Sequence, residues 1–254
     1  IKITTRGAKH LGAAIGDPTY VQEYMTKKVD EWIDELKLLC EYCISHPQCA
    51  YAVYTHGFAS KFTYTMRTIP DSAKYFQPLE DVIANLFIPT LLGVNVSPLT
   101  RDVLALPTRK GGLGISNPVI DAPLQFQHSN VVTANLKDLI KSQSQMLPDN
   151  LNQITRELIK SLKADKNERL TDELLILNES MSPSLKRCLE LAQAKSSSTW
   201  LTALPIAEEG LSLDKSTFRD ALWLRYGLNL RDMPQKCPCG STFNVNHAMI
   251  CKKG

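Results

Sequence analysis

The fold class is decided by the stretch Asp17-Pro-Thr-Tyr-Val-Gln-Glu-Tyr-Met-Thr-Lys-Lys-Val-Asp-Glu-Trp-Ile-Asp-Glu-Leu-Lys-Leu-Leu-Cys-Glu-Tyr-Cys43. Asp17 supplies an N-cap acceptor, and Pro18 suits the first helical position, where its missing N–H costs nothing. Apolar residues then recur at steps of three and four: Val21, Met25, Val29, Trp32, Leu36, Leu39 and Cys43. A continuous stripe of this kind predicts a long helix that packs one face into a core.

Apolar residues also recur at helical spacing in later parts of the chain, which predicts a mainly α protein. His46-Pro47 ends the first helix, and a second is expected to reach about Arg67 and to bury Ala50, Val53, Tyr54, Phe58 and Phe62. More helices are expected at 76–92, at 121–132, from Leu151 through Leu162, after Ser182-Pro183 and from Asp214 to Tyr226. Residues 1–16 read as a short strand and turn, 135–147 as polar and weakly patterned, and Ser196–Ser198 as the expected hinge.

Three glycines occur within four residues in Gly111-Gly-Leu-Gly114. Their spacing fits neither the Walker pattern nor the dinucleotide-binding fingerprint. The stretch therefore predicts a tight turn beside two exposed cations, Arg109 and Lys110, rather than a nucleotide site.

A soft-ligand set lies near the C-terminus, in Cys237-Pro-Cys239-Gly240 and His247-Ala-Met-Ile-Cys251. Three thiols and one imidazole suit Zn²⁺ in a closed, four-coordinate structural site. His247 and Cys251 are four residues apart and would share one face of a helix. The single residue between Cys237 and Cys239 is unusual, because two-residue spacers are commoner, so a turn with uncommitted thiols stays open as the alternative.

Cys40, Cys43, His46 and Cys49 form a second group, spaced by threes. Each step of three turns about 300° on a helix, so these side chains are expected to pack rather than to converge on a metal. Seven cysteines is an odd number and does not suggest an oxidised extracellular framework. No run approaches the roughly 20 apolar residues that span a bilayer. We therefore expect an intracellular protein with no membrane partner.

The net charge of +3 is unevenly distributed. From Lys215 onward, seven Lys and Arg face two Asp, which gives +5 there and leaves −2 for the rest. A polyanion partner is expected at this end, with a solvated basic surface as the alternative. Arg219, Trp223 and Tyr226 alternate cation and ring along one side of a helix. Such rings stack on bases or lie in a core, and the sequence leaves both interpretations open.

Several strings, taken in order, resemble reverse transcriptases of non-LTR (LINE-like) retrotransposons. They are His10-Leu-Gly12, Pro47-Gln-Cys-Ala-Tyr-Ala52 with His56-Gly57, Thr63-Tyr-Thr-Met-Arg67-Thr, Phe76-Gln-Pro-Leu-Glu80, Arg101-Asp-Val-Leu-Ala-Leu-Pro107 into Gly111-Gly-Leu-Gly-Ile115, Asn117-Pro118, Trp200-Leu201, Ala203-Leu-Pro205, Phe218-Arg-Asp-Ala221, Leu224-Arg-Tyr-Gly227 and Cys237 through Cys251. The likeness covers most of the chain and is thinnest between Asn135 and Lys195.

This resemblance implies the part of such a polyprotein that follows the catalytic palm, located in the nucleus and cytoplasm. Its expected divisions are a residual palm strand at 1–16, a helical thumb bundle at 17–134, a helical linker at 135–198 and a small basic Cys/His zinc-binding segment at 199–254. No Asp-Asp dipeptide occurs, so the two-metal carboxylate site of nucleotidyl transfer is missing. We therefore name no catalytic residue and expect this fragment alone to be inactive, with family members usually continuing beyond the position of Gly254.

The leading functional prediction is a non-catalytic fragment that binds nucleic acid: an RNA–DNA hybrid primer-template, element RNA or target DNA. The rest of the parent polyprotein would be its other partner. Candidate contact residues are Lys61, Arg67, Arg109, Lys110, Arg219, Trp223, Arg225, Arg231, Lys252 and Lys253. The alternative is a zinc-stabilised helical scaffold for protein interaction that makes no nucleic-acid contact.

Overall fold

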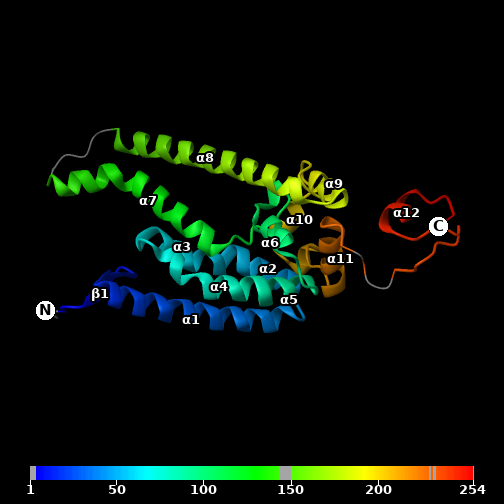
Figure 1. The fold of residues 1–254 in the computed structure, drawn as a ribbon, viewed down its shortest axis with the longest axis horizontal. Helices are drawn as coiled ribbons and strands as arrows, with labels where there is room; N and C mark the ends of the chain where they lie inside the picture. The colour runs from blue at the N-terminus through cyan, green and yellow to red at the C-terminus, as the bar shows by residue number, and fades with distance from the viewer. Residues whose placement is uncertain (1–3, 144–149, 229, 231–232, 254) are drawn as a thin grey trace.

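A computed structural model describes residues 4–143, 150–228, 230 and 233–253 (Figure 1). Helices account for 69% and strands for 4%, which confirms the mainly α fold. The strands and α-helices are β1 (Gly7–His10), β2 (Ala13–Gly16), α1 (Pro18–Cys43), α2 (Pro47–Val53), α3 (Ala59–Thr68), α4 (Gln77–Val82), α5 (Ile88–Leu92), α6 (Pro98–Ala105), α7 (Pro118–Lys141), α8 (Leu151–Ser180), α9 (Pro183–Ala192), α10 (Thr199–Thr202), α11 (Lys215–Arg225) and α12 (Val245–Ile250). Short 3-10 turns are η2 (Ser72–Tyr75), η4 (Thr108–Lys110) and η5 (Ala207–Glu209).

The N-terminal segment forms a hairpin of two antiparallel strands rather than one strand. Gly7 pairs with Gly16 and His10 with Ala13. The hairpin turn passes through Leu11 and Gly12, both at positive φ. The Tyr24 hydroxyl donates to Gly12 O at 2.7 Å, which ties the hairpin to α1.

Helix α1 confirms the predicted amphipathic stripe. The Asp17 carboxylate accepts from Tyr20 N at 2.7 Å and caps the helix. The buried side chains are Met25, Val29, Trp32, Leu36, Cys40 and Cys43, with Val21 and Leu39 half-buried at the margin of the core. The buried face of α1 is therefore rotated slightly toward Cys40 relative to the predicted stripe.

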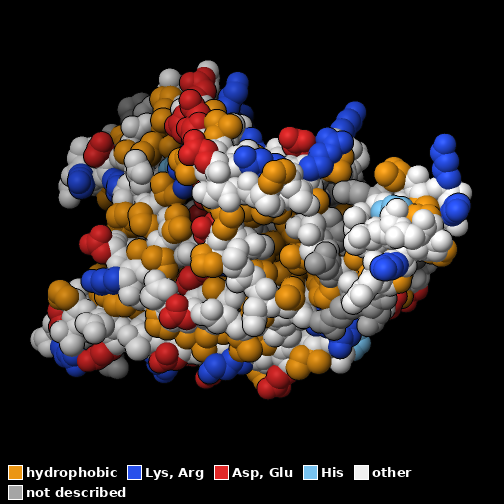
Figure 2. All heavy atoms as spheres, turned by 45° about the vertical axis from the view of Figure 1, so that its right-hand side comes forward, with side chains coloured by type: hydrophobic (Ala, Val, Ile, Leu, Met, Phe, Trp, Pro, Cys, Tyr) orange, Lys and Arg blue, Asp and Glu red, His pale blue; other side chains and the backbone are white. Residues whose placement is uncertain are grey.

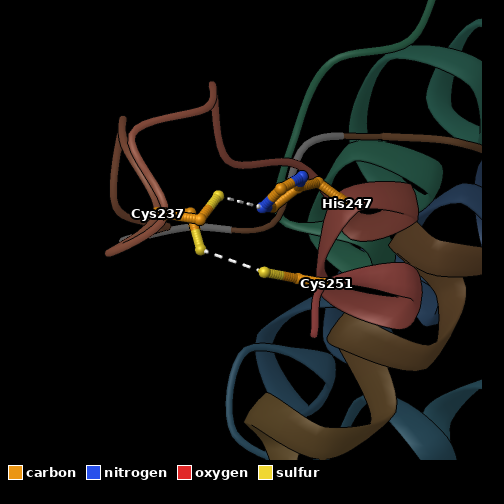
Figure 3. Close-up of side chains that lie close together, drawn as sticks. Cys237, His247 and Cys251 are labelled. Carbon is orange, nitrogen blue, oxygen red and sulfur yellow. Dashed lines mark hydrogen bonds between the residues drawn. The ribbon is translucent and has the colours of Figure 1, made fainter. Parts of the chain in front are cut away.

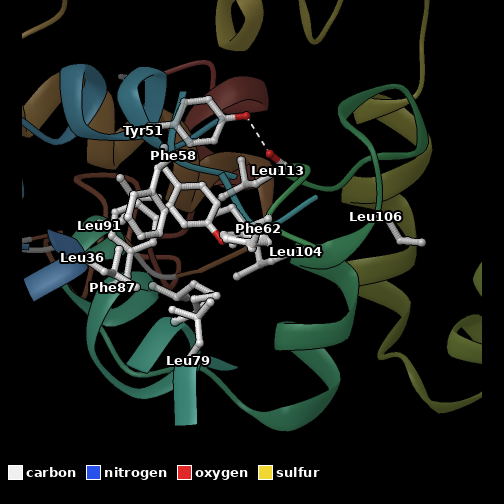
Figure 4. Packing of buried hydrophobic residues seen from close by; sticks show 14 of the residues in the cluster. Leu36, Tyr51, Phe58, Phe62, Leu79, Phe87, Leu91, Leu104, Leu106 and Leu113 are labelled. Atoms are coloured by element: carbon white, nitrogen blue, oxygen red, sulfur yellow. Dashed lines mark hydrogen bonds between the residues drawn. The ribbon is translucent and has the colours of Figure 1, made fainter. Parts of the chain in front are cut away.

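Two more core helices are each interrupted by one π-helical turn. The first runs from α2 to α3 through η1 (Tyr54–Phe58), and the second from α4 to α5 through η3 (Ile83–Phe87). The rings of Tyr54 and Phe87 stack with centroids 4.6 Å apart, and Phe87 belongs to the core drawn in Figure 4. The predicted burial of Val53 is wrong, because Val53 is 52% exposed and points away from the face that Tyr51 and Tyr54 share.

Helices α7 and α8 are longer than predicted and run beside the bundle in Figure 1. The Asn117 side chain accepts from Val119 N at 2.9 Å and starts α7 earlier than the predicted Asp121. Helix α7 then continues through polar residues to Lys141. The rest of the weakly patterned stretch, 144–149, lies outside the described residues. Because α8 buries only Leu170 and Leu174, its apolar pattern did not reveal its full length.

The glycine-rich stretch is a structural turn, as predicted. A Cβ on Gly112 would lie 1.9 Å from Leu106 O, so only glycine fits there. The carbonyls of this loop accept from buried side chains of other elements: Tyr51 Oη donates to Leu113 O at 2.7 Å, and Tyr226 Oη donates to Gly111 O at 3.1 Å. The loop therefore joins α2 and α11 through its own backbone.

A buried ion pair holds the other side of this loop. Arg101 donates to both carboxylate oxygens of Glu80 at 2.8 Å, and each side chain is 8% exposed. A further Arg101 N–H donates to Ile115 O at 2.7 Å. Burial raises the pKa of the Glu80 carboxyl, and the Arg101 guanidinium opposes that shift.

The core continues across the predicted boundary between residues 198 and 199. Phe218, Leu222 and Tyr226 of α11 belong to the same buried cluster as α1 and α2. Ser198, in the predicted hinge, donates to Thr108 O at 3.0 Å or Ala192 O at 2.9 Å, so the serine turn is hydrogen-bonded to the body. None of the helices in the described part of the chain combines the length and apolar character that crossing a bilayer requires.

Candidate metal centre

Two thiols lie on a short reversed loop. An antiparallel bridge between Lys236 and Thr242 closes the loop. Within it, Cys237 N donates to Ser241 O at 2.9 Å and Gly240 N donates to Cys237 O at 2.8 Å. Gly240 has φ 91°, in the left-handed region that favours glycine, and a Cβ there would meet nothing within 4 Å. Both sulfurs of the one-residue-spaced pair thus end on one side of the turn.

Of the other two candidate ligands, His247 lies in helix α12 and Cys251 directly follows it, at the C-terminal end of the molecule in Figure 1. The Asn244 side chain accepts from His247 N at 2.8 Å and so caps the helix at its N-terminus. Cys251 N in turn donates to His247 O at 2.9 Å. The predicted four-residue spacing therefore places imidazole and thiol on one face.

The four ligand atoms converge within 4.8 Å of one another. Cys237 Sγ lies 3.6 Å from Cys251 Sγ, and Cys239 Sγ lies 3.2 Å from His247 Nε2 (Figure 3). Zinc–sulfur bonds of about 2.3 Å in a tetrahedron put sulfurs about 3.8 Å apart. A disulfide would need about 2.05 Å, and all seven cysteines are free. The cluster can bind a metal ion, and the one-residue spacer does not prevent it.

The surroundings of Cys239 favour the thiolate form of this one candidate ligand, whereas the pKa of Cys237 is raised. Hydrogen bonds from the Ser241 hydroxyl and its backbone N–H lower the pKa of Cys239 to about 6. A thiolate at neutral pH is a better metal ligand than a thiol. Neither Ser241 nor Asn244 was predicted from the sequence, although an Asn three residues before a candidate ligand is a recognisable helix start.

The second cysteine group does not form a site. Cys40 and Cys43 are buried in the helical core, where desolvation raises their pKa values to about 11 and about 12. Across the described residues, the C-terminal cluster is the one group of three or more His, Cys, Asp or Glu side chains placed to share an ion. The packing interpretation of this ladder is confirmed.

The candidate cations of the helical body are dispersed and engaged with neighbouring side chains. Lys61 Nζ lies 2.5 Å from a Glu35 carboxylate oxygen. The remaining contacts are Arg67 Nε to Gln125 Oε1 at 2.9 Å, Arg109 Nη2 to Asn167 Oδ1 at 3.1 Å and Lys110 Nζ to Thr171 Oγ1 at 2.8 Å. Such contacts are weak at the surface, where Lys61, Arg67 and Arg109 are exposed. Lys110 is half-buried, so its predicted exposure is wrong.

Trp223 and Arg225 are core residues, which decides between the two interpretations that the sequence left open. Trp223 is 6% exposed and its indole N–H donates to Leu92 O at 2.7 Å. Arg225 is 9% exposed, and half-buried Arg219 donates to Thr90 O at 2.6 Å. An indole enclosed in this way cannot stack on a base without unfolding α11, so Trp223 is corrected to a packing residue.

Three exposed lysines are sequence neighbours of the Cys/His cluster. Lys252 and Lys253 follow α12, as predicted, and Lys236 precedes the first thiol. Figure 2 shows basic side chains projecting from this end of the molecule. Lys236 was absent from the predicted contact residues although the charge count included it, and Arg231 lies outside the described residues.

Comparisons with protein-family models, curated proteins and solved structures give no match to this chain.

Proposed function

We propose that the cluster of Cys237, Cys239, His247 and Cys251 binds a structural Zn²⁺. Three thiolates and one imidazole form the donor set typical of closed zinc sites, whereas Mg²⁺ and Ca²⁺ take oxygen ligands. With all four positions filled by protein there is no open position for water or substrate. Zinc would therefore hold the reversed loop against α12 and would not take part in catalysis.

We further propose that the protein is a non-catalytic nucleic-acid-binding part of a LINE-like reverse transcriptase. The observation that carries this proposal is the basic character of the metal segment. Residues 233–253 contain no Asp or Glu. Zn²⁺ with three thiolates carries −1, so Lys236, Lys252 and Lys253 leave the segment at +2. The resemblance of the sequence strings to that family supports the same proposal.

In this proposal the metal orients the lysines, and the helical body supplies a rigid support. Lys252 and Lys253 directly follow the ligand Cys251, so zinc binding fixes where their backbone starts. Lysine acts on nucleic acid as a point charge toward phosphate and carries no sequence information by itself. The expected partner is thus the sugar-phosphate backbone of an RNA–DNA hybrid, element RNA or target DNA.

The test is a fluorescence-anisotropy titration with duplex, hybrid and single strands at several salt concentrations. Replacing Lys252 and Lys253 together by Ala should reduce the slope of log K against log salt by about 0.9 for each phosphate that a lysine no longer neutralises. The matched control replaces Lys27 and Lys37, two exposed lysines of α1, and should leave the slope unchanged. Absence of affinity for every strand type at low salt would refute the proposal.

A second candidate function is a zinc-stabilised scaffold for protein interaction. It is favoured by the packing roles of Trp223 and Arg225, which remove two residues from the predicted nucleic-acid surface. A scaffold would keep its partner when Lys252 and Lys253 are neutralised and lose it when zinc is removed. The fragment alone should extend no primer in a single-turnover assay, and any incorporation would contradict both candidates.

A further inference from the structure

Arg225 is a buried cation without a carboxylate partner. One terminal nitrogen donates to Ser198 Oγ at 2.9 Å and to Thr108 O at 3.1 Å, which are both uncharged acceptors. Its Nε atom is buried with no hydrogen-bond partner. Among the described residues no acidic side chain forms an ion pair with it.

The other buried arginine, Arg101, differs from Arg225 because it has an acidic partner. Arg101 is as enclosed as Arg225, yet it faces both oxygens of Glu80. Removing a charge from water is unfavourable unless an opposite charge or a full set of hydrogen bonds replaces the water. Arg225 lies over the Tyr226 ring, 5.9 Å from its centroid, and a long contact of 3.5 Å reaches Gly112 O, but no carboxylate among the described residues pairs with it.

A hollow of about 280 Å³ lies next to the acceptors of Arg225. We call it the serine-turn hollow; Thr108, Arg109, Lys195, Ser196, Ser198 and Thr199 are among its lining residues. Two of these residues are exposed cations, Arg109 and Lys195, and no acidic residue lines the hollow. Arg109, whose guanidinium donates to Asn167 Oδ1 at 3.1 Å, and Lys195 line the hollow, while Arg225 lies behind Thr108 and Ser198 and does not line it.

The hydroxyls of the hollow are already oriented by the backbone. Ser198 donates to Thr108 O or Ala192 O, and Thr199 donates to Ser196 O at 2.8 Å. Ser196 holds φ 67°, a left-handed conformation that is unfavourable for a residue with a Cβ. The attraction for an anionic ligand therefore comes from Arg109, Lys195 and Arg225. The hydroxyls contribute to the shape of the hollow, and each could donate to a ligand only by giving up its hydrogen bond to a backbone carbonyl.

A neighbouring hollow lacks this charge imbalance. It measures about 210 Å³ and is lined by Lys166 and Arg169, but also by Asp121 and Glu173. Two cations and two carboxylates leave no net charge there. The serine-turn hollow is thus the better anion site of the two.

We propose that the serine-turn hollow binds a phosphate group between Arg109 and Lys195, with Arg225 behind it. The phosphate is either inorganic or carried by a nucleic-acid backbone. The nucleic-acid source rests on the proposed function above, whereas the inorganic source does not. Either one supplies the negative charge that the buried guanidinium lacks.

The experiment is isothermal titration of the zinc-loaded chain with inorganic phosphate at constant ionic strength. Lys195→Ala and Arg109→Ala should each weaken binding about tenfold or more, since each removes a charge-assisted hydrogen bond. The control Lys27→Ala removes an equal charge elsewhere and should change nothing. Arg225→Lys keeps the buried charge and should retain binding, with folding checked by circular dichroism. No saturable binding, or an equal loss in the control, would overturn the proposal.

The source of the phosphate is tested by competition. If an oligonucleotide without terminal phosphates displaces inorganic phosphate from the wild type and Lys195→Ala weakens both, the site takes the phosphodiester of a nucleic-acid backbone. If only inorganic phosphate binds, the proposal of a phosphate site is supported and its ligand is the free ion. Cys239→Ser should leave phosphate binding intact. Loss of the metal segment's function can therefore be distinguished from loss of phosphate binding in the serine-turn hollow.

Discussion

Metal removal should unfold the C-terminal segment and leave the helical body intact. Helix α12 has six residues, and isolated helices below about 12 residues are marginal in water. The reversed loop adds only a few backbone hydrogen bonds. Structural zinc binding contributes about 10–16 kcal/mol to such segments, far more than these contacts supply, so the metal-free segment should be unfolded.

Metal removal should cost the C-terminal segment its structure and should leave the structure of the helical body almost unchanged. Chelation should remove at most the six helical residues of α12, a small fraction of a protein that is 69% helix. Amide exchange should increase at Cys237, Gly240, Ala248 and Cys251, whose N–H groups are hydrogen-bonded within the segment. Exchange in α1 should stay unchanged, because none of the four ligands lies in the helical core.

Thiol alkylation followed by mass spectrometry gives the most direct measurement. In zinc-loaded protein the three thiol ligands should be protected, and after chelation Cys237, Cys239 and Cys251 should react together. Cys40 and Cys43 should remain unreactive in both samples, because burial raises the pKa of each thiol. The reasoning is refuted if those two thiols become reactive on chelation, or if the ligand thiols already react fully in the zinc-loaded sample.

Three further changes test the body of the protein. Glu80→Leu should destabilise by about 3–5 kcal/mol in urea unfolding, because it leaves buried Arg101 without a counter-charge. Trp223→Phe should cost about 1 kcal/mol by losing the hydrogen bond to the end of α5, and should leave nucleic-acid affinity unchanged in anisotropy. A hydrogen bond from the Ser216 hydroxyl lowers the pKa of Asp214, so this carboxylate stabilises the fold above about pH 4 and loses that effect as pH falls. Asp214→Ser keeps a capping acceptor but cannot titrate, so its urea midpoint should fall less steeply on acidification.

Features that depend on neighbours in sequence were predictable. The stripe of α1 and the spacing of His247 and Cys251 are local periodicities, and both are observed. The boundaries of α7 and α8 were not predictable from apolar periodicity, because exposed helices need no continuous apolar stripe. A single side-chain cap at Asn117 set the start of α7 instead.

Features that depend on distant partners could not be read from the chain. Alternation of cations and rings in α11 fits a base-stacking surface and a packed helix equally well. The choice depended on Leu92, a carbonyl 131 residues away, which accepts from the Trp223 indole. The serine-turn hollow likewise depends on Arg225 meeting Thr108 across the fold, a pairing that no local spacing encodes.

The glycine-rich turn also determines how the molecule would respond to mechanical tension. Any pull on the C-terminal end that passes into α11 reaches the backbone at Gly111 and Gly112, through Tyr226 and Arg225. The opposite side of the same turn is attached to α2 by Tyr51. Tension from α11 and tension from α2 therefore meet in the backbone of the same turn. We expect these two helices to separate from the body together with the turn rather than one at a time.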